Sequence, residues 1–164
     1  MRMASRRTVP LAALALCALL LLVLPAADAA PGRAPTDKGD AFLSADTGGV
    51  FDLEAGECFT DPEHSAVLGQ VTVLYTPCTD GADNQVYGFV TAPDGTFDRA
   101  GLAAFAWETC ERGFTTFWPG EAARGLDFYP VLPTAATWAF GDQDVMCVVY
   151  RPSGELTDSL LPLR

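Results

Sequence analysis

Four of the five cysteines carry the clearest chemical signal in the sequence, and they are Cys58, Cys78, Cys110 and Cys147. Successive members of this set are 20, 32 and 37 residues apart, so the close C-x-x-C pairs that bind zinc do not occur. We therefore expect disulfide bonds, no metal and no cofactor. Four cysteines allow three pairings. The most economical pairing joins Cys58 to Cys78, and Cys110 on a predicted helix to Cys147 on a predicted strand.

Side chains that could catalyse a reaction are sparse. The only histidine, His64, lies in a polar segment expected to be a surface turn, which argues against a Cys–His pair or a hydrolase triad. A glycosidase needs two carboxylates beside a cleft. The nearest candidates are Glu57 and the pair Asp142 and Asp144, of which Asp142 is expected to shape a turn and Asp144 to be solvated. A non-enzymatic protein is the leading hypothesis, and a cell-wall hydrolase using a carboxylate pair is the alternative.

Aromatic residues are the remaining candidates for a functional role. Trp107 and Trp118 lie at or beyond the edge of the apolar stripe of the predicted helix, and Phe128 and Tyr129 lie on a predicted edge strand. Tryptophan and tyrosine are enriched at the centres of protein interfaces. These four residues are therefore predicted to form an interaction surface, although each of them could instead pack in the core or at its rim.

The first 29 residues have the form of a signal peptide. Three arginines precede an apolar run over 11–24, and Ala27-Asp28-Ala29 resembles a cleavage site. The apolar run is short for a membrane span, so we expect cleavage and no stable membrane anchor afterwards. The general secretory route and the twin-arginine route both stay open. The chain is thus predicted to be secreted or extracytoplasmic and associated with the cell envelope.

The charge of the remaining chain narrows the classes of partner. Removal of residues 1–29 leaves 7 basic and 20 acidic residues, a net charge of −13. Nucleic acids and anionic lipid surfaces require a basic patch, so neither is an expected partner. Such a charge keeps a secreted protein soluble. It is also compatible with a cationic partner, and we expect an envelope protein or a cell-wall polymer.

The pattern of turns and periodicities divides the chain into a flexible N-terminal tail over 30–49 and one domain over 50–164. The strongest strand signal is the run 145–150, whose alternate residues are apolar on both faces, which is typical of a central strand covered on both sides. The other expected elements, in chain order, are a hairpin of strands 71–75 and 85–90, a helix from about Asp98 to just before Pro119, an edge strand over 126–132, a helical turn capped by Thr134 and a final short strand within 154–160. Together they predict an α+β fold, a small antiparallel sheet with one long helix packed on a face.

The order of several short motifs resembles the actinobacterial septum formation domain family. These motifs are Gly56-Glu57-Cys58-Phe59, Pro77-Cys78, Val86-Tyr87-Gly88, a helix ending in Cys110, Trp138 with Gly141-Asp142, Val145-x-Cys147 and Leu156-Thr157-x-Ser159-Leu160. The resemblance implies an extracytoplasmic module with structural cysteines, a link to septum formation and no catalytic residues.

Two positions depart from that family pattern. Gly81-Ala82 stands where a Pro-His pair is common, and Gln143 stands where an arginine commonly follows Gly-Asp. If the family histidine has a role, this chain lacks it. The residues thus favour an exported, non-enzymatic envelope module that binds another envelope protein or a cell-wall component, and a passive structural secreted protein is the further alternative.

Overall fold

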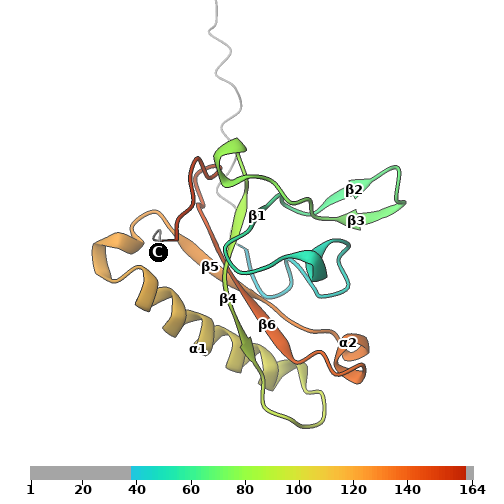
Figure 1. Cartoon of the computed structure of the whole chain (residues 1–164). Coiled ribbons are helices and arrows are strands. Elements are labelled where there is room, and N and C mark those ends of the chain that lie inside the picture. Colours follow the sequence, from blue (N-terminus) through green and yellow to red (C-terminus); the bar gives the residue numbers. More distant parts are fainter. Residues whose placement is uncertain (1–37, 162–164) are drawn as a thin grey trace, which may run out of the picture. The chain divides into compact units, whose positions relative to one another are not determined.

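The computed structural model describes residues 38–161, and a four-stranded antiparallel sheet organises them (Figure 1). In spatial order its strands are β1 (Cys58–Phe59), β4 (Asn84–Thr91), β6 (Asp144–Tyr150) and β5 (Asp127–Val131). A separate hairpin consists of β2 (Glu63–Ser65) and β3 (Gln70–Thr72). The helices are α1 (Arg99–Phe117) and α2 (Ala135–Ala139), with 3-10 turns η2 (Val50–Asp52), η3 (Cys78–Asp80) and η4 (Gly120–Ala123). The predicted α+β class, with one long helix on a small antiparallel sheet, is confirmed.

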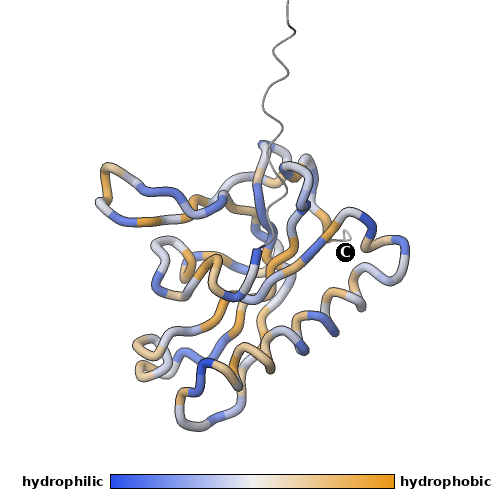
Figure 2. The backbone as a smooth tube through the Cα atoms, turned by 180° about the vertical axis from the view of Figure 1, so that it is seen from behind, coloured by the Kyte–Doolittle hydropathy of each residue, from blue (hydrophilic) through white to orange (hydrophobic). Residues whose placement is uncertain are grey.

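Strand β6 is the central strand that its apolar faces predict. It pairs with β4 on one side and β5 on the other. Val145, Cys147 and Val149 pack in the cluster formed with α1. The alternate residues, such as Met146 and Val148, pack in a second cluster on the opposite face. Hydrophobic residues accordingly concentrate in the strands of this sheet and recur at intervals along α1 (Figure 2).

Helix α1 begins and ends where the sequence predicts. The side chain of Asp98 accepts a hydrogen bond from the backbone N–H of Ala100 and caps the first turn. Residues four apart, from Leu102 to Phe114, bury one stripe of the helix against the sheet. Pro119 follows the last turn and cannot continue it. Thr134 caps the short helix α2, as the sequence predicts, and the structure adds a reciprocal capping box with Thr137.

Residues 38–53, which we call the strap, cover the face of the sheet opposite α1. Leu43, Val50 and Leu53 are buried and belong to the same cluster as Val148 of β6. The prediction of a flexible tail over 30–49 is therefore wrong for residues 38–49, because isolated apolar residues there fill a face that the helix leaves open. The rest of that tail and the predicted signal peptide lie outside the described residues.

The predicted hairpin of 71–75 and 85–90 is wrong. Strand β3 pairs with β2 instead, and β4 pairs with β1 and β6. Residues 84–87 are buried on both faces and therefore require a central position, whereas Val71, Leu74 and Tyr75 are exposed. The predicted final strand within 154–160 is also absent, and only a single bridge joins Leu156 to Ala82 there.

Both predicted disulfides are present. Cys58 bonds to Cys78, with the two Cα atoms 5.2 Å apart, and this bond ties β1 to η3. Cys110 bonds to Cys147 across 5.5 Å between Cα atoms, and this bond ties α1 to β6. Disulfides persist in oxidising compartments outside the cytoplasm, so the two bonds fit an extracytoplasmic protein. Within residues 38–161, no helix has the length and hydropathy needed to cross a bilayer.

Candidate functional site

The carboxylates singled out in the sequence have local partners. Glu57 accepts a hydrogen bond from the backbone N–H of Glu54 at 2.8 Å. Asp142 accepts one from the backbone N–H of Asp144 at 3.2 Å, which confirms that Asp142 shapes the turn before β6. Asp144 is exposed and accepts a hydrogen bond of 2.7 Å from the hydroxyl of Thr91. His64 is exposed, as expected, but it lies in β2 rather than in a turn.

The four aromatic residues predicted to form an interaction surface lie in different environments. Trp118 is buried, and its indole N–H donates to the carbonyl of Leu160 at 3.2 Å. Tyr129 is fully buried on the strap side of the sheet. Trp107 and Phe128 are half-buried and touch each other, with ring centroids 5.4 Å apart. The predicted surface is therefore wrong for Trp118 and Tyr129, because both rings are used to fill the two faces of the core.

A pocket of about 190 Å³ opens between the strap and the sheet. The strap contributes Val50 and Phe51, and the sheet contributes Phe89 of β4 and Met146 of β6, all of them apolar. Asp142 and Asp144 add two carboxylates to the lining. The structure thus brings the predicted carboxylate pair to a small pocket, but it places both groups beside apolar side chains that were not among the predicted site residues.

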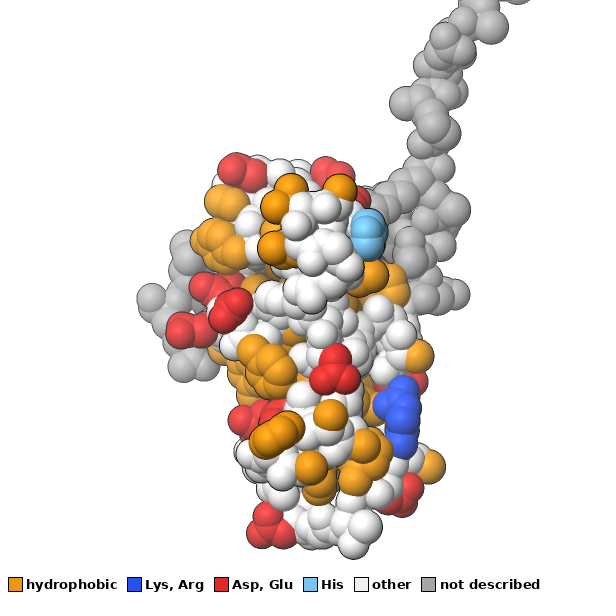
Figure 3. Space-filling view, turned by 90° about the vertical axis from the view of Figure 1, so that its right-hand side faces the viewer, with side chains coloured by type: hydrophobic (Ala, Val, Ile, Leu, Met, Phe, Trp, Pro, Cys, Tyr) orange, Lys and Arg blue, Asp and Glu red, His pale blue; other side chains and the backbone are white. Residues whose placement is uncertain are grey.

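Exposed apolar residues continue beyond this pocket. Phe51 is 65% exposed and Phe89 45% exposed, and Phe140, which precedes the turn at Asp142, is 93% exposed. Val67 and Leu68 are exposed in the loop between β2 and β3. Figure 3 views the molecule from the side toward which the hairpin, η2 and α2 project: hydrophobic side chains lie in several groups with acidic ones between them, and lysine or arginine appears only at one edge.

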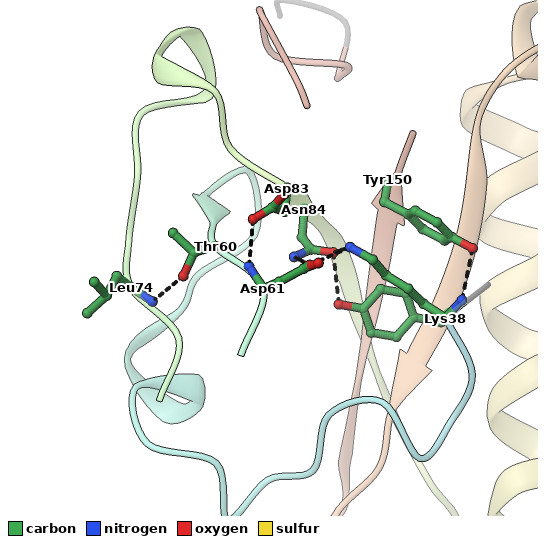
Figure 4. Close-up of polar contacts among 8 residues, drawn as sticks. Lys38, Thr60, Asp61, Leu74, Asp83, Asn84 and Tyr150 are labelled. Carbon is green, nitrogen blue, oxygen red and sulfur yellow. Dashed lines mark hydrogen bonds and ion pairs between the residues drawn. The ribbon is translucent and has the colours of Figure 1, made fainter. Parts of the chain in front are cut away.

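Apart from this pocket, a polar cluster lies where the start of the strap meets the sheet (Figure 4). Lys38 is only 7% exposed, and its ammonium donates to Asp61 Oδ1 at 2.5 Å and to Asn84 Oδ1 at 2.8 Å. Asn84 Nδ2 in turn donates to the same Asp61 oxygen at 2.9 Å. The backbone N–H of Lys38 donates to the hydroxyl of Tyr150 at 3.1 Å. The ammonium of Lys38 is thus bound to β4 and to the loop after β1, and its backbone is bound to β6.

Aromatic rings enclose the same ammonium. Its nitrogen lies 4.8 Å from the ring centroid of Tyr150, 5.0 Å from that of Phe42 and 6.0 Å from that of Tyr129. Ring faces attract cations at such distances. Burial raises the pKa of the Tyr129 phenol well above its ordinary value of 10.0, and the charge of Asp61 adds to the rise. Tyr129 therefore stays protonated and donates to Asn84 Oδ1 at 3.0 Å.

The cluster is suited to holding a cation. A nucleophilic lysine must be neutral, whereas the Asp61 carboxylate and the ring faces stabilise the charged ammonium of Lys38. The sequence offered one hint of this role, since Lys38 is the only lysine in the chain. Its partners are spread over more than a hundred residues, so their convergence could not be read from spacing.

Comparison of the chain with protein-family models, curated proteins and solved structures finds no match. The resemblance to the septum formation family stays a prediction drawn from the residues alone.

Proposed function

We propose that the chain is an exported, non-enzymatic module of the cell envelope that binds a basic, amphipathic segment of another envelope protein. The observation that carries this proposal is the pocket between the strap and the sheet. It combines exposed aromatic rings with two carboxylates on a strongly acidic domain. The disulfides support an extracytoplasmic location, and the family resemblance supports a role at the septum.

The size of the pocket suits one amino-acid side chain. Sites for drug-sized ligands usually enclose about 300–1,000 Å³, whereas this pocket has about 190 Å³. Phe51 and Phe89 leave much of their area exposed, and large aromatic rings at a concave site are typical anchors of protein interfaces. An apolar side chain inserted between them would bury these rings and gain the corresponding hydrophobic free energy.

The charges of the domain favour a basic residue beside that apolar side chain. Residues 38–161 include 19 acidic and 5 basic side chains, a net charge of −14 with His64 neutral. None of the five basic side chains lines the pocket, whereas Asp142 and Asp144 do. A lysine or arginine of the partner would pair with these carboxylates, and the negative field of the whole domain would steer it there.

Retention on isolated envelopes tests the proposal. The oxidised protein is mixed with cell envelopes of its source organism, and both the pelleted protein and any soluble wall fragments are measured. We expect retention that falls with added salt. Replacement of Phe51 and Phe89 by serine should weaken retention by about tenfold or more, because two anchor rings are lost. Phe140→Ser is the matched control, since Phe140 is exposed but does not line the pocket.

Protease treatment of the envelopes distinguishes the classes of partner. Loss of retention after treatment agrees with a protein partner. Unchanged retention would contradict a protein partner and indicate a cell-wall polymer instead. Equal effects of the Phe51/Phe89 and Phe140 variants would remove the pocket from the binding site. Release of wall fragments that stops in an Asp142→Asn or Asp144→Asn variant would replace the proposal with the hydrolase alternative. No retention at all would leave the passive structural role.

A further inference from the structure

The side chains around Lys38 are of the kinds that bind a cation, and the cation that they hold is a side chain of the same protein. Among the described residues, Asp61, Asn84 and the rings of Phe42, Tyr129 and Tyr150 converge on one ammonium group. Asn84, Tyr129 and Tyr150 lie on strands of the sheet and are almost completely buried. Their positions are therefore set by the sheet and do not depend on the lysine for their backbone geometry.

The oxygen atoms of the cluster specify a primary ammonium rather than any cation. Asp61 Oδ1 and Asn84 Oδ1 each accept an N–H bond from Lys38. The Asn84 amide is oriented for this purpose, since its nitrogen donates to Asp61 and its oxygen also accepts from Tyr129. A quaternary ammonium ion has no N–H to donate, so it could not replace the two N–H bonds that these oxygens accept from Lys38. An alcohol could donate one bond but carries no charge for the carboxylate and the ring faces.

We propose that Asp61, Asn84, Phe42, Tyr129 and Tyr150 form a primary-ammonium site, which Lys38 occupies and which binds a free alkylammonium ion when that side chain is removed. The site lies at the start of the strap, and the strap reaches the pocket through Val50 and Phe51. Occupation of the site by the Lys38 ammonium thus fastens one end of the segment that forms a wall of the pocket. The proposal does not depend on what the pocket binds.

Chemical rescue of a Lys38→Ala variant tests the site. The substitution removes three methylene groups and the ammonium, which together correspond to n-propylammonium. The variant should unfold at a lower temperature than the wild type, because it loses the Lys38 ammonium, 4% exposed, and its ion pair with the Asp61 carboxylate. At ten times its Kd, n-propylammonium should raise the Tm of Lys38→Ala by about 5 °C at constant ionic strength. The wild type should show no such rise.

Four controls, two compounds and two variants, define the chemistry. Neither 1-propanol nor tetramethylammonium should rescue Lys38→Ala, since the first lacks the charge and the second lacks N–H donors. Leu43→Ala removes a buried side chain from the same strap without touching the ammonium, so n-propylammonium should not stabilise it. Adding Asp61→Asn to Lys38→Ala should abolish the rescue.

The measurement decides the proposal even if Lys38→Ala does not fold. In that case n-propylammonium should restore its circular dichroism spectrum, and a failure to do so at 200 mM would overturn the site. An equal Tm rise for Leu43→Ala, or with tetramethylammonium, would show a general solvent effect and overturn it as well. A Lys38→Ala variant as stable as the wild type would show that the bound ammonium contributes nothing to the stability of the fold, which also contradicts the proposal.

Discussion

Removal of the Cys110–Cys147 disulfide should destabilise the domain more than removal of Cys58–Cys78. The two bonds close chain segments of 37 and 20 residues. Loop-closure entropy in the unfolded state then gives about 3.8 and about 3.3 kcal/mol of stabilisation, respectively. This difference is small on its own. The environment of the sulfur atoms enlarges it.

Burial of the sulfur atoms adds a packing contribution. Cys110 and Cys147 are both fully buried between α1 and β6, whereas Cys78 is partly exposed. A buried group of this size contributes about 1 kcal/mol when its removal leaves a cavity. Replacing Cys110 and Cys147 by alanine should therefore cost about 6 kcal/mol, and replacing Cys58 and Cys78 about 4 kcal/mol. Against a total of about 5–15 kcal/mol for typical domains, loss of both bonds should leave the chain largely unfolded.

Urea unfolding of the two double variants, followed by tryptophan fluorescence and circular dichroism, measures these free energies. Trp118 packs 5.6 Å from the ring of Tyr87 and reports on the helix–sheet interface. The slope of the free energy against urea should rise in both variants, because an uncrosslinked unfolded chain exposes more surface. A larger loss for the Cys58/Cys78 variant, or unchanged slopes in both, would refute the account of loop closure plus buried sulfur.

Two further predictions concern the strap and the helix interface. Gly49→Ala should destabilise the domain in urea unfolding by at least about 1 kcal/mol more than Gly69→Ala. Both glycines have positive φ, but only a Cβ at Gly49 would meet a backbone oxygen, that of Val73, at 2.6 Å. Equal losses of stability in the two variants would contradict the close contact. Burial also raises the pKa of the Tyr87 phenol, so the folded state retains a proton that the unfolded state releases above pH 10. Above pH 10, Tyr87 should therefore lower the free energy of unfolding by about 1.4 kcal/mol per pH unit. Tyr87→Phe should remove that part of the slope in urea titrations between pH 9 and 11.5, and an unchanged slope would show that the phenol ionises normally in the fold.

Local patterns predicted the elements whose signals are short in range. Helix α1 follows from a cap at Asp98, a repeated apolar stripe and a stop at Pro119. Strand β6 follows from two apolar faces, which require cover on both sides. The two disulfides follow from the simplest pairing, which joins Cys58 to Cys78 and joins the helix, through Cys110, to Cys147 on the central strand. In each case the deciding information lies within the segment itself or in a count of four cysteines.

The errors share one physical cause, which is that pairing and burial depend on distant segments. Residues 71–75 and 85–90 have good strand signals, but β3 and β4 find different partners because only β4 can be buried on both faces. The strap has weak local signals, and it is ordered because α1 leaves one face of the sheet uncovered. The pocket and the Lys38 site combine strap residues with sheet residues, so neither could be predicted before the strap was placed.

The way the strap is held links the two proposed sites. Both disulfides end on the sheet, on α1 or on η3, and residues 38–53 include no cysteine. The strap is therefore held to the sheet by burial, hydrogen bonds and the Lys38 contacts rather than by a covalent crosslink. Because Phe51 lines the pocket only when the strap is docked, a ligand in the pocket must favour docking. By the same linkage, any change at Lys38 that lowers the fraction of molecules with a docked strap must lower the apparent affinity for that ligand in proportion to this fraction.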